Sequence, residues 1–275
     1  MKTLIVPVDF SSASVNAANY ALDFAKAIDS SIILLYVCQV PIAFSEVPVA
    51  ASTVQETFDD AEKELAVLKQ NLLHRSDNKV KIYTELKEGF VVNQVAEYCR
   101  KINPYAVIMG ASGSTAAERV IFGSNTIDAL KSLSWPLIIV PKGARFNQVK
   151  NIGLASDLKN VIEAVHADEI KKMVKDLHAT LHILHVYSNQ DKIIGNPEIE
   201  GSEWIRDMFE ELQPEFHFLN HDKIDVAIHS FAEKNNLDML IVIPKKHGWL
   251  EGLFHNSDSK QVALHSHMPL LSVHQ

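Results

Sequence analysis

Residues 106–113 read AVIMGASG, and nine residues later the chain continues with GSNT at residues 123–126. The apolar run predicts a buried strand that ends at Gly110, and the helical pattern that follows Gly123 predicts a helix. Such an arrangement can hold a phosphate, because the first N–H groups of a helix are unpaired and carry partial positive charge. Glycine lets the backbone approach an anion without a Cβ in between. This stretch therefore predicts an α/β sheet with an anion site where a strand ends.

The rest of the first half alternates strands and helices around this stretch. Apolar runs that predict buried strands lie at residues 4–8, 32–37, 106–109 and 136–140. A shorter, alternating run at residues 80–83 predicts a strand near an edge. Helical patterns separate these five strands, which favours an open parallel sheet with right-handed crossovers.

The second half repeats the pattern of the first. Its apolar runs at residues 152–156, 181–186, 239–243 and 268–273 match the first-half strands in order, and Asp157 matches Asp9. Four matches in the same order indicate a tandem duplication. We therefore expect two domains, residues 1–145 and 146–275. The linker at about 142–148 is too short for a flexible tether, so the domains are expected to pack together.

Composition excludes several classes of protein. The 275 residues carry a net charge of −8; residues 1–145 hold 14 Lys+Arg and 15 Asp+Glu, whereas residues 146–275 hold 12 and 19. Neither half offers the basic face typical of a nucleic-acid-binding protein. No apolar run is long enough to cross a bilayer, and the N-terminal run is too short for a signal peptide, so a cytoplasmic location is expected.

Asp9 and Gly110 are predicted to face the same crevice. Asp9 follows the first strand and Gly110 ends the fourth, and ligands of open α/β sheets bind where the strand order reverses. Asp9 can accept hydrogen bonds from the base or sugar of a nucleotide, while Gly110, Gly113 and Gly123 can surround its phosphates. The alternative interpretation is that the glycines belong to two unrelated tight turns, because two spaced glycines alone are weak evidence for a phosphate site.

The spacing Gly110-x2-Gly113-x9-Gly123-Ser124, with Asp9 and the run WPLIIV at 135–140, resembles the universal stress protein family. The resemblance covers the whole chain as two copies, the first well and the second partially. It implies two tandem open parallel five-stranded sheets with helices on both faces, Rossmann-like and similar to the adenine nucleotide alpha hydrolases. It also implies ATP, accompanied by Mg²⁺, in the first crevice. The implied binding residues are Pro7, Val8, Asp9, Val37, Met109, Gly110, Gly113, Gly123, Ser124, Asn125 and Thr126.

The second copy departs from this glycine pattern. Pro244 stands at the position of Gly110, His247 at that of Gly113, and residues 254–256 at that of residues 122–124. Proline has no N–H to offer, and side chains replace bare backbone. We therefore predict that the second copy binds ATP weakly or not at all.

The first copy has no Gly-Lys-Ser/Thr sequence, so it is not a P-loop. Glu118 and Arg119 lie between the glycines, where a solvated loop pair is favoured over a catalytic role. The expected function is a nucleotide-responsive regulatory module with unidentified protein partners and no predicted catalytic residues. A slow ATP hydrolase and an interaction module without nucleotide remain as alternatives. Single-copy family members pair through their last strands, so residues 137–140 and 270–273 are expected to form an intramolecular pseudo-dimer; a homodimer of chains is compatible with this.

The 13 histidines raise the question of a metal site. His182 and His185 are three apart on a predicted strand and so point to opposite faces. His247 and His255 share the degenerate loop but need a third ligand, such as Asp157. Ordinary surface histidines are favoured, and no metal site is predicted. Cys38 and Cys99 are predicted to be packing residues.

Overall fold

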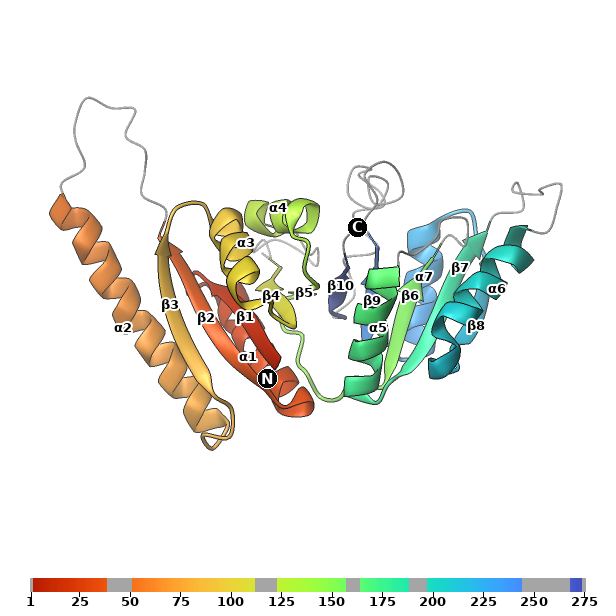
Figure 1. Cartoon of the computed structure of the whole chain (residues 1–275), viewed down its shortest axis with the longest axis horizontal. Coiled ribbons are helices and arrows are strands. Elements are labelled where there is room, and N and C mark those ends of the chain that lie inside the picture. The colour runs from red at the N-terminus through yellow and green to blue at the C-terminus, as the bar shows by residue number, and fades with distance from the viewer. Residues whose placement is uncertain are drawn as a thin grey trace, which may run out of the picture. The chain divides into compact units, whose positions relative to one another are not determined.

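The computed structural model of the chain describes residues 2–38, 51–111, 123–156, 164–187, 197–243 and 268–273. The side chains of residues 51–54, 164–165 and 197–202 are not among those described. The chain divides into two compact units, and the boundary between them lies between Phe146 and Asn147. Each unit is an α/β sheet with its own helices (Figure 1).

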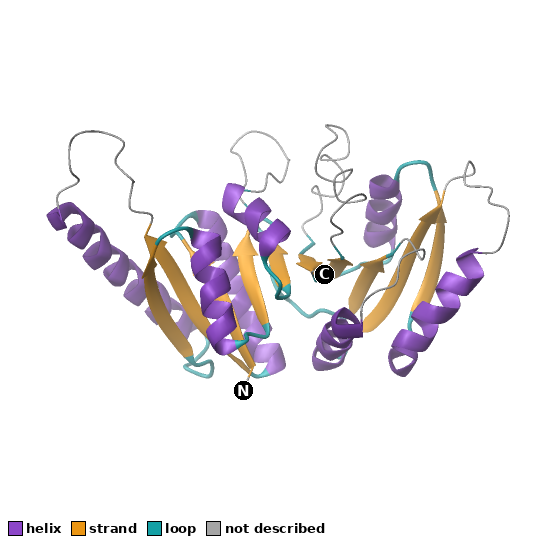
Figure 2. Cartoon of the chain, turned by 45° about the horizontal axis from the view of Figure 1, so that its top comes forward, coloured by secondary structure: helices purple, strands orange, loops and turns teal. Residues whose placement is uncertain are grey.

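The first unit is a parallel five-stranded sheet in the order β3-β2-β1-β4-β5. Its elements, in chain order, are β1 (Lys2–Val8), α1 (Ser12–Ile28), β2 (Ser30–Cys38), α2 (Ala51–Arg75), β3 (Ile82–Glu88), α3 (Val91–Ile102), β4 (Ala106–Gly110), α4 (Ser124–Ser132) and β5 (Leu137–Val140). Helices α1 and α2 cover one face, and α3 and α4 cover the other (Figure 2).

The second unit has the same order of strands, β8-β7-β6-β9-β10. Its elements are β6 (Asn151–Ala155), α5 (Ala164–Leu177), β7 (Thr180–Tyr187), α6 (Pro197–Phe209), a 3-10 turn (Glu210–Leu212), β8 (Glu215–Asn220), α7 (Ile224–Lys234), β9 (Met239–Val242) and β10 (Leu270–Ser272). The predicted α/β fold, a parallel sheet between two layers of helices, is thus confirmed. The predicted pairing of the two last strands stays a prediction.

Central strands are buried on both faces, which explains their unbroken apolar sequences. In β1, Leu4, Ile5 and Val6 have no exposed surface. Helix α1 packs on this layer through small residues and Phe24, and it begins at Ser11, whose hydroxyl accepts a hydrogen bond from the Ser14 N–H. The strands predicted at residues 4–8 and 32–37 are confirmed, because they lie within β1 and β2.

The third strand differs from its prediction. It was expected at residues 80–83, but β3 runs from Ile82 to Glu88. Its second half carries Glu85, Lys87 and Glu88, which a buried strand would exclude. An edge strand accommodates them because only β2 pairs with it.

The chain after β5 folds back on the first unit. The side-chain N–H₂ of Asn16 donates to the carbonyl oxygens of Pro141, at 3.1 Å, and Ala144, at 3.3 Å. The Phe146 ring then packs edge-on against Tyr20 and Phe24, with ring centroids 5.4 Å and 5.5 Å away. Much of the predicted linker is therefore part of the first unit rather than a tether.

Candidate functional site

The candidate site of the first unit lies where β1 and β4 end side by side. These neighbouring strands are parallel, with Leu4 opposite Ala106 and Ile5 opposite Val107. The connections from β1 and β4 leave in opposite directions, so this is the point where the strand order reverses. Crevices at such points are where open α/β sheets bind ligands. Asp9 directly follows β1 and Gly110 ends β4, so the two residues lie at neighbouring strand ends.

Asp9 is held by the first turn of α1. Its Oδ1 accepts a hydrogen bond from the Ser11 N–H at 3.0 Å, and its own N–H donates to the Ser14 hydroxyl at 3.3 Å. Loss of water on its packed side would raise the pKa of Asp9, but the hydrogen bonds with Ser11 and Ser14 hold it below its usual value. The exposed Asp9 side chain is therefore a carboxylate at neutral pH, fixed in place as an acceptor.

Gly110 lies directly against the same turn of α1. A Cβ at this position would sit 2.4 Å from the carbonyl oxygen of Ala13 and 3.1 Å from the Ser14 nitrogen. Only glycine allows strand and helix to approach this closely. Glycine at this position is therefore required by packing, whether or not an anion binds.

Helix α4 is attached to Gly110 at its N-terminus. The buried Thr126 hydroxyl donates to the Gly110 carbonyl oxygen at 3.3 Å. Gly123 is the N-cap residue, and its carbonyl oxygen accepts from the N–H groups of Thr126 and Ile127. No side chain among the described residues caps this helix. The first-turn N–H groups at Ser124 and Asn125 are therefore candidates to bind an anion next to the end of β4.

The remaining predicted residues fall into two groups. Pro7, Val8, Val37 and Met109 are buried in their strands, so they can line the crevice floor but offer little exposed surface. Gly113 lies outside the described residues, as do Ser112, Glu118 and Arg119. The loop that would complete the phosphate site stays a prediction.

One feature of this crevice was not predicted from sequence. Phe10 follows Asp9 with a positive φ of 60° and stacks on Tyr36 of β2, with ring centroids 5.1 Å apart. A positive φ is unusual for a bulky residue. Sequence offers little signal for this, because neither the φ angle nor the cross-strand contact follows from a hydrophobic pattern.

The second unit places its histidines as the strand geometry requires. His185 Nδ1 lies 3.1 Å from the Ser156 carbonyl oxygen, whereas His182 lies near His217 and Phe231. The two side chains thus face different neighbours. Asp157, Pro244, His247 and His255 lie outside the described residues, so the altered phosphate loop and the metal question there stay predictions.

Both cysteines are buried free thiols. Burial raises the pKa of Cys99 to about 12, and burial together with the charge of Glu88 raises that of Cys38. Such thiols are poor nucleophiles at neutral pH. Their environment fits the packing role predicted for them.

Two other features of the described residues bear on function. A groove of about 870 Å³ lies between α2 and β3, lined by residues that include Phe58, Leu65 and Leu86, and it contains neither Asp9 nor Gly110. Among the described helices, none combines the length and the apolar character needed to span a membrane.

Comparisons with known proteins point to one family. Residues 1–141 match the model of the Universal stress protein family. The chain is 30% identical over 143 residues to Universal stress protein MJ0531 of Methanocaldococcus jannaschii, an alignment that covers 51% of this chain and 82% of the relative.

Solved structures agree at the level of the fold. A universal stress protein from Archaeoglobus fulgidus DSM 4304 superposes with a TM-score of 0.73 at 19% identity, covering 98% of this chain and 97% of that chain. A functionally unknown protein from Pseudomonas aeruginosa PAO1 superposes with a TM-score of 0.61 at 16% identity, covering 100% of this chain and 92% of that chain.

Proposed function

Because the chain belongs to the universal stress protein family, we propose that its first unit binds ATP, accompanied by Mg²⁺, where β1 and β4 end. ATP occupancy then makes the protein a nucleotide-responsive regulatory module in the response to stress. The observation that carries this proposal is that α4, whose N-terminus has no side-chain cap, is attached to Gly110 beside the turn that holds the Asp9 carboxylate.

The chemistry of the crevice suits a nucleoside phosphate. The Asp9 carboxylate accepts hydrogen bonds from the amino or hydroxyl groups of adenosine. The first-turn N–H groups of α4, with the Ser124 hydroxyl and the glycine loop, bind the phosphates. The acceptor follows β1, and the donors lie in the loop and helix that follow the neighbouring strand β4. One molecule with a polar sugar and an anionic tail can therefore satisfy both.

The second unit, in this proposal, binds no ATP. Its chain keeps an aspartate at position 157 but carries Pro244, His247 and residues 254–256 in place of the glycine loop. The two copies therefore form a natural comparison, in which the same change can be made at matched positions.

Calorimetric titration of the full chain with ATP and Mg²⁺ tests the proposal. We expect one site per chain. Asp9→Asn keeps an oxygen that can accept from the Ser11 N–H, so the fold is preserved, but it removes the charge, and affinity falls about tenfold or more. The matched variant Asp157→Asn leaves ATP binding unchanged.

Two results would contradict the proposal. The first is a chain that shows no titratable ATP and, by mass spectrometry of the denatured protein, releases none. The second is a pair of equivalent sites per chain. Release of phosphate from ATP is measured for the unmodified chain, with Gly113→Val as the control. This assay distinguishes a slow ATP hydrolase from a regulatory module that keeps ATP intact.

A further inference from the structure

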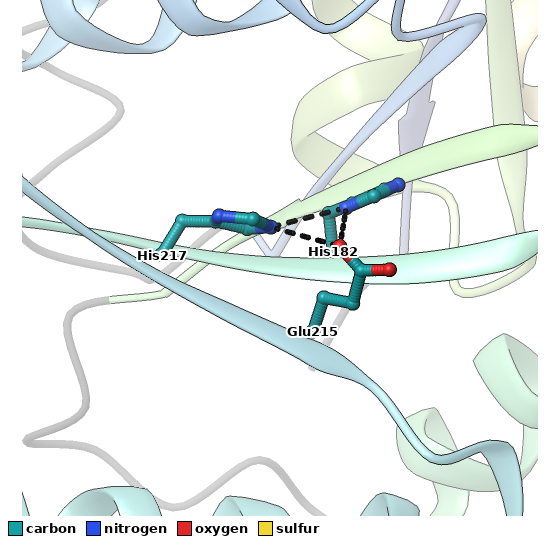
Figure 3. Close-up of side chains that lie close together, drawn as sticks. All are labelled: His182, Glu215 and His217. Atoms are coloured by element: carbon teal, nitrogen blue, oxygen red, sulfur yellow. Dashed lines mark hydrogen bonds and ion pairs between the residues drawn. The ribbon is translucent and has the colours of Figure 1, made fainter.

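Three potential metal ligands meet in the second unit, at the amino ends of β7 and β8. These strands are parallel, with His182 opposite Glu215 and Leu184 opposite His217. The side chains of His182, Glu215 and His217 therefore converge on one point (Figure 3). This is the end of the sheet opposite to that used by Asp9 and Gly110 in the first unit.

The three ligand atoms have the separations that a tetrahedral ion requires. His182 Nδ1 lies 3.1 Å from His217 Nε2 and 3.4 Å from Glu215 Oε2, and the last two atoms are 3.7 Å apart. An ion with bonds of about 2.0–2.1 Å at tetrahedral angles holds its ligand atoms about 3.3 Å apart. The cluster needs only small adjustments to accept such an ion.

The orientation of His182 is set by a second layer of hydrogen bonds. Asn151 donates through Nδ2 to the Asn236 carbonyl oxygen at 3.3 Å, which leaves its Oδ1 facing His182 Nε2, also at 3.3 Å. Nε2 must then carry the proton, and Nδ1 presents its lone pair to the cluster. Metal-binding histidines typically donate their other N–H to such a partner.

The surroundings hold the imidazoles in place and leave one side open. The Phe231 ring packs against both, with centroids 4.5 Å from His217 and 6.4 Å from His182. His182 is 8% exposed, whereas the Glu215 side chain is 59% exposed. Burial lowers the pKa of both histidines, and His182 lowers that of His217 further, although Glu215 opposes this.

We propose that His182, Glu215 and His217 bind a Zn²⁺ ion, with water from the exposed side as the fourth ligand. Two histidines and one glutamate form a known zinc-binding set in which the fourth position stays open. The ion joins the edge strand β8 to β7. Without an ion, the arrangement is a hydrogen bond from His217 Nε2–H to His182 Nδ1, and the experiment decides between the two.

The first unit supplies an internal comparison. Its register places Ile33 opposite Tyr83 in the same way that His182 is opposite Glu215. Ile33, Tyr83 and Glu85 therefore occupy the positions of His182, Glu215 and His217, and they do not form a zinc ligand set. The proposed site belongs to the second unit alone.

The full chain, freed of metal with a chelator, tests the proposal by titration with ZnCl₂ at pH 7.5. We expect the unmodified chain to bind one Zn²⁺ ion that His217→Gln and Glu215→Gln each fail to bind. These two positions are chosen because their side chains are more exposed than that of His182. His221→Gln, an exposed histidine beyond the end of β8, is the matched control and keeps full binding. Asn151→Ala, which removes the partner of His182, weakens binding about tenfold.

Co²⁺ gives a visible absorption signal that reports metal coordination directly. The signal would not change if the three residues only stabilised the fold. We expect the visible absorption of tetrahedral Co²⁺ in the unmodified chain and in His221→Gln, and its loss in His217→Gln. Circular dichroism checks that each variant is folded. Zn²⁺ binding that is equal in His217→Gln, Glu215→Gln and the unmodified chain would overturn the proposal, as would the absence of any binding.

Discussion

Gly110 shows how one residue can belong to a binding motif and still be required by packing. The atoms nearest to a Cβ at this position are the carbonyl oxygen and carbon of Ala13, at 2.4 Å and 2.6 Å. Both are backbone atoms of α1, so they cannot move without shifting the helix. Glycine at the end of β4 is therefore weaker evidence for a phosphate site than the spacing alone suggests.

Gly110→Ala is expected to lower the free energy of unfolding by about 2–3 kcal/mol, because the added methyl group overpacks the contact with α1. Urea denaturation without nucleotide measures this. Gly153→Ala is the comparison: its Cβ meets only the ends of leucine side chains, the nearest being Leu237 at 2.7 Å, which can shift more readily than the backbone of α1. Equal losses in the two variants would contradict the packing argument.

Thr126 and Ser124 separate stability from binding within α4. Thr126 is buried and donates to Gly110, so Thr126→Val is expected to cost about 1 kcal/mol of stability. Ser124 is exposed, so Ser124→Ala is expected to weaken ATP binding while leaving the denaturation midpoint nearly unchanged. If Thr126→Val leaves stability unchanged, the attachment of α4 does not depend on the threonine hydroxyl. Equal losses in the two variants would show that Ser124 also stabilises the fold.

At the scale of elements, the edge strands explain what the sequence could and could not predict. Central strands such as β1 are buried on both faces, and their continuous apolar runs identify them. Strand β8, with the sequence EFHFLN, alternates polar and apolar residues and was not located from the sequence. The partner of His182 was therefore missed, because His217 and Glu215 could be placed beside it only once β8 was in register.

The crevice was predictable for a different reason. Asp9, Gly110 and the start of α4 each follow a recognisable strand or precede a recognisable helix, so parallel strand geometry places them together. The positive φ of Phe10 and its stacking on Tyr36 depend on the local path of the backbone, which periodicity does not encode. Element order thus predicted that Asp9 and Gly110 lie at the ends of neighbouring strands, but not that Phe10 stacks on Tyr36.

Helix α5 makes a prediction about pH. Burial raises the pKa of Glu169 to about 7, although Lys172 opposes this. The folded state then binds a proton that the unfolded state has lost, so this residue's contribution to stability falls as pH rises from about 4.5 to 7. Glu169 is only about half buried, so solvent screens part of this effect. Glu169→Gln is expected to stabilise the protein at pH 8, by on the order of 1 kcal/mol, and to change little at pH 4.5.

Thermal denaturation at the two pH values measures this difference. Asp168→Asn is the control on the same helix, because the Asp168 side chain is 78% exposed and pairs only loosely with Lys171, at 3.7 Å. A gain that is the same at both pH values would show that burial of the Glu169 charge is not its source.

At the scale of the whole molecule, one architecture carries two different sets of candidate site residues. The first unit combines a carboxylate and a helix N-terminus without a side-chain cap at the carboxyl ends of its strands. The second unit gathers two histidines and a glutamate at the amino ends. The two units share the same strand register, and different residues at matching positions account for the difference.

This view predicts that a metal site can be transferred between the units. Ile33→His, Tyr83→Glu and Glu85→His together place the three ligand types at the matching register of β2 and β3. We expect Zn²⁺ binding to rise from one ion per chain to two, by calorimetry and Co²⁺ absorption. A folded triple variant that still binds one ion would show that register alone does not build the site.

The contacts of residues 141–146 with α1 bear on how the protein is made. Asn16, Tyr20 and Phe24 already lie within the first unit, and the segment that ends at Phe146 completes their contacts. As the chain leaves the ribosome, the first unit can begin to fold once Phe146 has emerged. Residues 147–275 take on the order of 10 s more to translate. A newly made first unit could therefore meet the cell's ATP before its companion has been synthesised.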